Sequence, residues 1–90
     1  MIRISGFVAI AMVTALRELK EPADHGFRLY RAKGDLHLCI DSVQSTDHVI
    51  HQDGQVALII DKQLDQELGD KVLDVESLVD ESSLVFRKDI

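Results

Sequence analysis

The order of apolar and polar positions predicts a strand, a long helix and then a series of short strands. Ile2 and Ile4 alternate with polar residues, as in a short strand. Ser5 is suited to cap the next element, because its hydroxyl can accept backbone N–H bonds. We expect that element to be a helix over 6–20. Pro22 follows it, and a proline pushes the preceding residue out of the helical region.

The apolar run at the start of this helix has a second interpretation. Arg3 precedes it, and Val13-Thr14-Ala15 resembles a small-residue cleavage site, so the segment also has the features of a signal peptide. The helix is favoured because the run continues as Leu16 and Leu19 at helical spacing, with charged residues between them. On that interpretation the helix covers a sheet with its large apolar side chains, which are Phe7, Ile10, Met12, Val13, Leu16 and Leu19.

Period-two alternation predicts a hairpin of two strands, at 27–31 and 36–41. The short loop Ala32–Asp35 joins them, with Gly34-Asp35 supplying the turn residues. Side chains on a strand alternate between its two faces. One face of the second strand then carries Leu36, Leu38 and Ile40, and the other carries His37, Cys39 and Asp41.

A second hairpin is predicted at 48–60. Asp53-Gly54 fits a two-residue type I′ turn, because both central residues need a positive φ. The strand Val56–Ile60 is apolar on both faces, which is typical of a central, covered strand. One helix can cover only one of these faces. The other needs a second sheet or another subunit, so we expect a homodimer. The polar segment Ser42–Asp47 is interpreted as a linker.

The remaining residues predict a short helix and two further strands. Asp61 is expected to cap the helix, with Leu64 and Leu68 on one side and Gly69 as its stop signal. Strands are expected at 71–75 and 84–87, joined by a polar segment with a helical turn. We expect the acids around the short helix to form a solvated face rather than a calcium site, and these are Asp61, Asp65, Glu67 and Asp70.

Composition and charge exclude several classes of function. The net charge of −6 and the absence of a basic stripe argue against nucleic acid and anionic membrane as partners. No apolar run reaches the roughly 18 residues that span a bilayer. A single cysteine cannot form an intramolecular disulfide, so nothing indicates an oxidising compartment, and we expect a cytoplasmic protein with an unknown protein partner.

The order and spacing of these segments resemble the HesB-type (A-type) family of iron–sulfur cluster biogenesis proteins. The most specific stretch is Asp47–Asp61, with an acidic start, a short strand, a tight turn and an apolar strand that ends in Asp. Gly26-Phe27-Arg28-Leu29 is similar to a family strand. The matches elsewhere are Ile4-Ser5, Leu64, Leu68-Gly69, Leu73-Asp74 and Phe86. The resemblance implies one α+β domain over 1–90, with mostly antiparallel strands in two small sheets covered by the N-terminal helix.

Three cysteines carry the function of this family, and the chain departs from the pattern at all three. One belongs in a loop after the first hairpin strand, where this chain has only Ala32–Asp35. Two belong in a tail, and the sequence reaches Ile90 without them. Cys39 matches a strand position and not a ligand position. The resemblance therefore supplies no cluster ligands here.

Cys39 and His37 are the weak candidates for binding a metal or cofactor. Their residue types suit soft metals, but successive side chains on one strand face lie roughly 7 Å apart, so they rarely converge on one ion. Burial as a small apolar side chain is the favoured interpretation of Cys39. His48 and His51 are expected to face opposite ways, and His25 lies in a loop.

These observations predict a non-catalytic HesB-like domain that acts as a binding or accessory module. We expect no catalytic residues, no metal site and no cofactor. The alternative is an iron or iron–sulfur carrier with unusual ligands, in which Cys39 and His37 are shared across a dimer.

Overall fold

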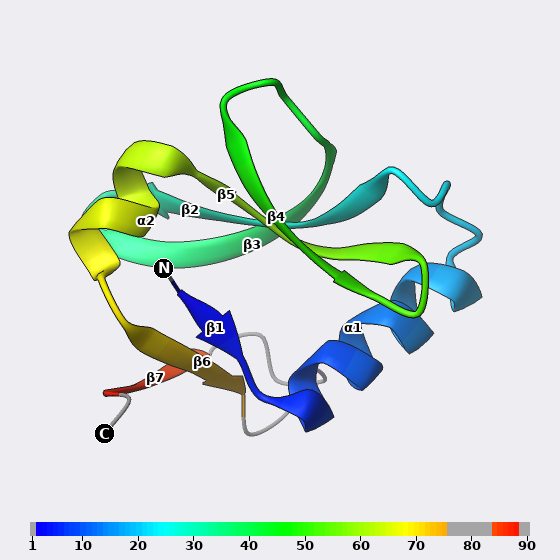
Figure 1. Ribbon diagram of the computed structural model, residues 1–90, viewed down its shortest axis with the longest axis horizontal. Helices are drawn as coiled ribbons and strands as arrows, with labels where there is room; N and C mark the ends of the chain where they lie inside the picture. Colours follow the sequence, from blue (N-terminus) through cyan, green and yellow to red (C-terminus); the bar gives the residue numbers. More distant parts are fainter. Residues whose placement is uncertain (1, 76–83, 89–90) are drawn as a thin grey trace.

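The computed structural model of the chain describes residues 2–75 and 84–88 (Figure 1). The expected helical turn between the last two strands lies outside these residues. The elements follow the predicted order, and their bounds are β1 (Arg3–Ile4), α1 (Gly6–Glu18), β2 (His25–Ala32), β3 (Asp35–Ser42), β4 (Asp47–Gln52), β5 (Gln55–Asp61), α2 (Lys62–Leu68), β6 (Lys71–Val75) and β7 (Leu84–Lys88). The α+β prediction is confirmed.

Helix α1 begins at the predicted cap and ends slightly before the predicted end. The Ser5 hydroxyl accepts the Val8 N–H at 3.2 Å, which satisfies one of the free donors of the first turn. The C-cap is Leu19, and Lys20 leaves the helix with a φ of 58°. The chain therefore turns away two residues before Pro22.

Within the described part of the chain, helix α1 packs through one side. Met12, Val13 and Leu16 are buried, as expected. The prediction that three other apolar side chains also cover the sheet is wrong, because Phe7, Ile10 and Leu19 are 74%, 58% and 59% exposed. The helix is apolar around most of its circumference, and a helix lying on one surface can bury only the stripe that faces it.

Strands β2 to β5 form a mixed sheet in the order β3-β2-β5-β4. The two hairpins are antiparallel and meet through a parallel pair, β2 with β5. Asp53 and Gly54 have φ values of 53° and 76°, which confirms the predicted tight turn. Strand β5 is central and Val56–Ile60 is buried throughout, which is also confirmed.

The core combines side chains of this sheet with side chains of β1 and of the two helices. It includes Ile2, Val8, Met12, Val13, Leu29, Ala57, Leu58, Ile60, Leu64 and Leu68. Ile59 points the other way, because it is the register partner of Arg28, and it is nevertheless 0% exposed. The second face of β5 is thus covered within the chain. That face gives no reason for a dimer, and the homodimer stays a prediction.

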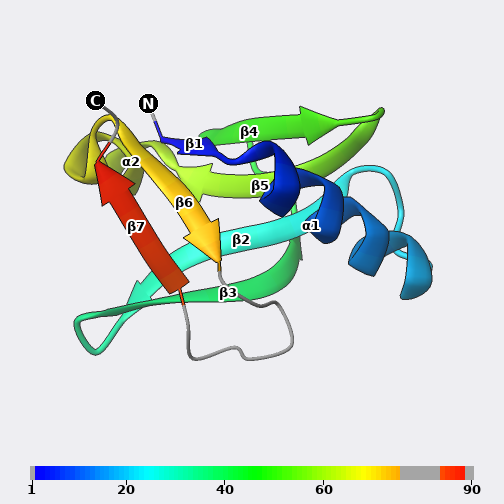
Figure 2. The ribbon, with the colours of Figure 1, turned by 90° about the horizontal axis from the view of Figure 1, so that it is seen from below.

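A smaller three-stranded sheet has the order β1-β6-β7. Strand β1 is parallel to β6, and β6 is antiparallel to β7. In Figure 2 this sheet and α1 lie on the same side of the four-stranded sheet. Within residues 2–75 and 84–88, no helix has both the length and the apolar character to cross a membrane.

Candidate functional site

The β2–β3 hairpin occupies the place where the sequence resemblance puts a cysteine loop. Its strands pair without interruption from His25↔Ser42 to Ala32↔Asp35. The turn between them is Lys33-Gly34, with φ values of 53° and 83°. These values are those of a two-residue type I′ turn. The hairpin therefore closes on itself, and no loop long enough to reach a metal projects from it.

Cys39 lies on β3 and is exposed, so the prediction that it is buried is wrong. The physical reason is the strand order, which places β3 at an edge of the sheet. The core side of β3 is taken by Leu36 and Leu38, which pack against the buried cluster. Cys39 alternates with them and therefore lies on the outer face.

His37 shares this outer face with Cys39 and is also exposed. Its ring contacts Tyr30, with the two centroids 5.5 Å apart. Within the described part of the chain, no three histidine, cysteine or acidic side chains are grouped so that they could hold one metal ion. The structure thus brings Cys39 and His37 to one surface without bringing them together as a site.

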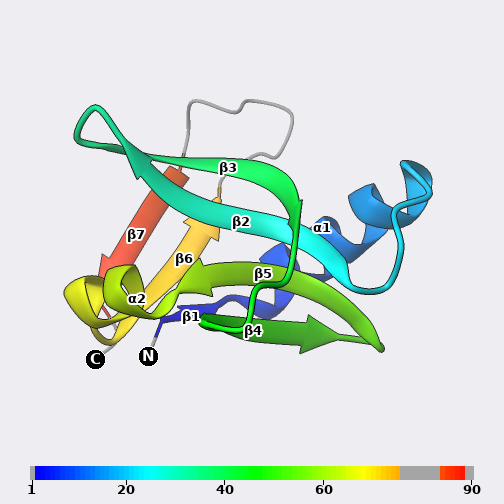
Figure 3. The same cartoon turned by 90° about the horizontal axis from the view of Figure 1, so that it is seen from above.

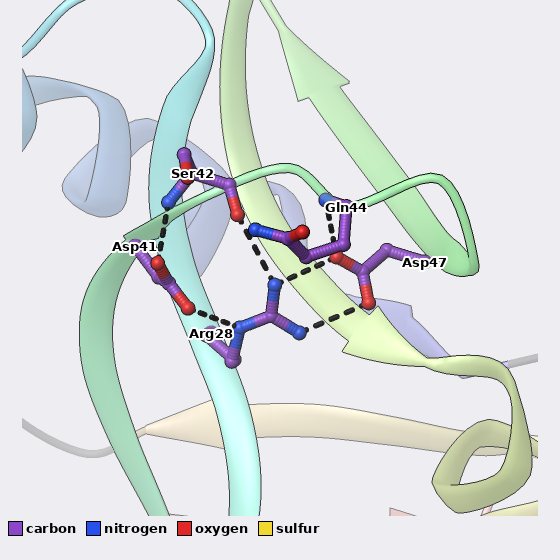
Figure 4. Close-up of polar contacts among 5 residues, drawn as sticks. All are labelled: Arg28, Asp41, Ser42, Gln44 and Asp47. Carbon is purple, nitrogen blue, oxygen red and sulfur yellow. Dashed lines mark hydrogen bonds and ion pairs between the residues drawn. The ribbon is translucent and has the colours of Figure 1, made fainter.

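The most tightly bonded polar cluster centres on Arg28, which sequence reasoning missed (Figure 4). Its guanidinium donates to both Asp47 carboxylate oxygens, at 3.0 and 2.6 Å. It also donates to Asp41 Oδ2 at 2.7 Å and to the Ser42 carbonyl at 3.1 Å. Asp47 is itself almost fully buried and accepts the Gln44 N–H at 2.7 Å. Every partner of Arg28 lies at or beside the segment that joins β3 to β4.

The charges of this cluster stabilise one another. Its hydrogen bonds to Asp47 raise the pKa of Arg28 further above its usual range, against the opposing effect of burial. The hydrogen bond from Arg28 holds the pKa of Asp47 below its usual value, and the same is true of Asp41. All three groups are therefore charged at neutral pH.

The cluster fixes the crossover between the two hairpins. Residues 43–46 pass over β2 and β5 on the face opposite α1 and the small sheet (Figure 3). Arg28 binds both ends of this crossover, through Asp41 and Ser42 on one side and Asp47 on the other. The segment predicted to be a plain linker is therefore held against the sheet.

Asp65 forms a second buried polar cluster, and the prediction that it belongs to a solvated face is wrong. It is 2% exposed. One carboxylate oxygen accepts the Ile2 N–H at 2.7 Å, and the other is bonded to His48 Nδ1. Asp65 is one residue after Leu64 and three before Leu68, so all three lie on the inner side of α2. The three-residue spacing between Asp65 and Leu68 was the sequence signal that could have predicted its burial.

A groove of about 350 Å³ lies between β2 and the start of α2. Its lining residues are Arg28, Leu29, Tyr30, Arg31, Asp61, Gln63, Leu64 and Glu67. Arg31 and Glu67 form an ion pair at 2.8 Å. Both arginines of the groove are thus already paired with acids, so the groove is not built as an anion site.

The remaining candidates stay apart. His25 is bonded to Glu21 through Nδ1, at 3.0 Å. His51 is exposed on β4, beyond a register shift that follows Ile50. His48 is half-buried and bonded to Asp65. In the described contacts, no two of these histidines share a hydrogen-bond partner.

Comparison with protein-family models gives no match for this chain. A search of curated proteins finds no match either. Among solved structures, the chain is similar to the crystal structure of Escherichia coli SufA, a protein involved in the biosynthesis of iron–sulfur clusters. The TM-score is 0.56 and the identity 21%, over 96% of this chain and 81% of that one. This chain has a SufA-like fold. The α+β fold implied by the sequence resemblance is thus confirmed.

Proposed function

We propose that this SufA-like domain is a non-catalytic binding or accessory module related to iron–sulfur cluster biogenesis, and that it does not carry a cluster itself. The similarity in fold to SufA supports the relation to that process. The observation that carries the second half of the proposal is the β2–β3 hairpin. It closes through Lys33-Gly34, where the sequence resemblance places the loop with the first cluster ligand.

The number of available ligands agrees with this proposal. An iron–sulfur cluster is generally held by four cysteine thiolates, or by thiolates with histidine. The sequence contains one cysteine, so two copies of the chain would supply only two thiolates. The histidine nearest to it along the strand, His37, lies two residues away and contacts Tyr30.

One observation favours a second candidate function, a metal carrier with ligands shared across a dimer. Cys39 is exposed instead of buried, and His37 is exposed on the same face of β3. A second copy could therefore approach both side chains. If this candidate is correct, metal binding depends on both side chains and on dimer formation.

Anaerobic reconstitution with ferrous iron and sulfide separates the two candidates. The accessory module is expected to return from desalting without iron, sulfide or visible absorbance. A shared carrier is expected to keep iron in stoichiometric amount and to lose it in Cys39→Ser and in His37→Ala. Both side chains are exposed, so the two variants should fold as the wild type does. If the wild type retains iron and neither variant does, the shared carrier replaces the accessory module as the proposed function.

A further inference from the structure

Strand β3 is an edge strand within residues 2–75 and 84–88. Among the described residues, β3 pairs only with β2, and its register runs along all of Asp35–Ser42 without a shift. Natural edge strands are often protected by proline, by charged side chains such as lysine, or by a bulge. Strand β3 has no proline, lysine or bulge, and its two acids, Asp35 and Asp41, lie near its ends. The opposite edge, β4, has a register shift between Ile50 and His51. With respect to the described residues, the β3 edge is therefore open to a further strand.

The hairpin turn determines which backbone groups point outward. In a hairpin with a two-residue turn, the residues that flank the turn form a hydrogen-bonded pair, and the pairs alternate from there. The flanking pair here is Ala32↔Asp35. The backbone groups of His37, Cys39 and Asp41 then point to β2. Those of Leu36, Leu38 and Ile40 point to the free edge.

We propose that β3 pairs with β3 of a second copy of this chain, antiparallel and centred on Cys39. The two four-stranded sheets then join into one continuous sheet. Cys39 faces Cys39 of the partner subunit in a non-hydrogen-bonded pair. Such pairs bring the two Cα atoms to roughly 4.5 Å. The outward groups of Leu38 and Ile40 supply the hydrogen bonds on either side.

Charge favours the register centred on Cys39 over the adjacent register centred on Leu38. With Cys39 at the centre, His37 lies opposite Asp41 of the partner subunit, and the pair occurs twice. A centre at Leu38 would instead place Asp35 opposite Asp41, and like charges directly opposite destabilise a sheet. The side chain of Asp41 is 43% exposed although it is bonded to Arg28, so it can accept from a second donor.

The same register covers an exposed apolar side chain. Ile40 is 37% exposed on the core side of the edge. In the proposed pairing it lies beside Leu38 of the partner subunit, which packs at the margin of the core. Cross-strand apolar pairs of this kind stabilise a sheet. The inference does not rest on the proposed function, because both an accessory module and a shared carrier are compatible with it.

Charge substitutions at His37 test the pairing. Light scattering coupled to size exclusion, over a range of concentrations, should show a mass that rises from 10.1 kDa toward twice that value. His37→Glu should raise the dimer dissociation constant by about tenfold, and His37→Lys should not raise it. The same changes at His51, exposed on β4, should have no effect. A mass that stays monomeric, or equal effects at both positions, would overturn the proposal.

Two further variants test the register. Ile40→Pro removes an N–H that points away from β2, so the monomer should fold while the dimer is lost. Ile40→Thr keeps the N–H and should keep the dimer. Mild oxidation with diamide should convert the wild-type dimer into a disulfide dimer, since Cys39 lies within the Cα range of disulfides. A dimer that survives Ile40→Pro, or that fails to crosslink, would show that another surface holds it.

Discussion

Arg28 and Asp47 form a two-bonded ion pair that joins the middle of β2 to the first residue of β4. The guanidinium Nη2 lies 2.6 Å from Asp47 Oδ2, and Nη1 lies 3.0 Å from Oδ1 (Figure 4). Pairs of this geometry are stronger and more directional than single hydrogen bonds. This pair holds the crossover of 43–46 against the outer face of the sheet (Figure 3).

Removal of the arginine should strongly destabilise the domain. In Arg28→Met the Asp47 carboxylate stays almost fully buried without its cationic partner. Breaking a buried pair on one side costs about 3 kcal/mol. Chemical denaturation of the two proteins at neutral pH measures this difference. Arg31→Met is the control, because its ion pair with Glu67 is half-exposed and should contribute about 0.5 kcal/mol.

The stability of the wild type should fall in acid because of the same pair. The pKa of Asp47 is lower in the folded chain than in the unfolded chain, where it is about 3.9. The stabilisation is therefore fully present above the unfolded value and is lost as the pH falls through the folded value. Unfolding curves from pH 6 down to strong acid should show a smaller loss in Arg28→Met. An equal loss in both proteins would contradict the assignment.

Asp65 should be needed to hold the N-terminal strand. Asp65→Ala leaves the Ile2 N–H without its buried acceptor, which costs about 2 kcal/mol. Asp65→Asn keeps an oxygen for that bond and should lose less. Thermal unfolding compares the two variants with Glu67→Gln, a change on the exposed side of α2. If both Asp65 variants unfold at the same temperature as Glu67→Gln, Asp65 does not stabilise the N-terminal strand.

Gly26 should tolerate no side chain. A Cβ there would lie 2.9 Å from the Val56 carbonyl oxygen, and backbone in a central strand cannot move aside. We expect Gly26→Ala to destabilise the domain by about 2 kcal/mol, as overpacking does. Gly6→Ala is the matched control, since nothing lies within 4 Å of its added Cβ. Denaturant titration of both variants decides the point.

The Cys39 thiol should react freely in the folded protein. It lies exposed on the outer face of an edge strand. At low protein concentration, labelling with a maleimide should proceed at nearly the same rate in native and denatured chains. Much slower labelling of the native chain under these conditions would restore the buried interpretation.

Local signals predicted the elements of this fold well. Ser5, Pro22 and the Asp53-Gly54 turn each act on the backbone of adjacent residues, so their effects can be predicted from a few neighbouring residues. Strand β5 was also predictable as a central strand, because burial on both faces requires a continuous apolar run.

The features that were not predicted depend on how distant segments of the chain pair and pack. The partners of Arg28 lie 13 to 19 residues away, so only the strand order brings them together. The exposure of Cys39 depends on that same order, which puts β3 at an edge. Phe7 and Ile10 follow the helical pattern, but the pattern does not say which side of an apolar helix meets the sheet.

Native mass spectrometry of protein purified without oxygen shows whether the chain carries a cluster. We expect chains of 10.1 kDa, alone or in pairs, with no added mass from iron or sulfide. The spectrum of Cys39→Ser should differ only by the substitution. A wild-type species that carries iron and sulfide, and loses both in Cys39→Ser, would show that the protein is a cluster carrier.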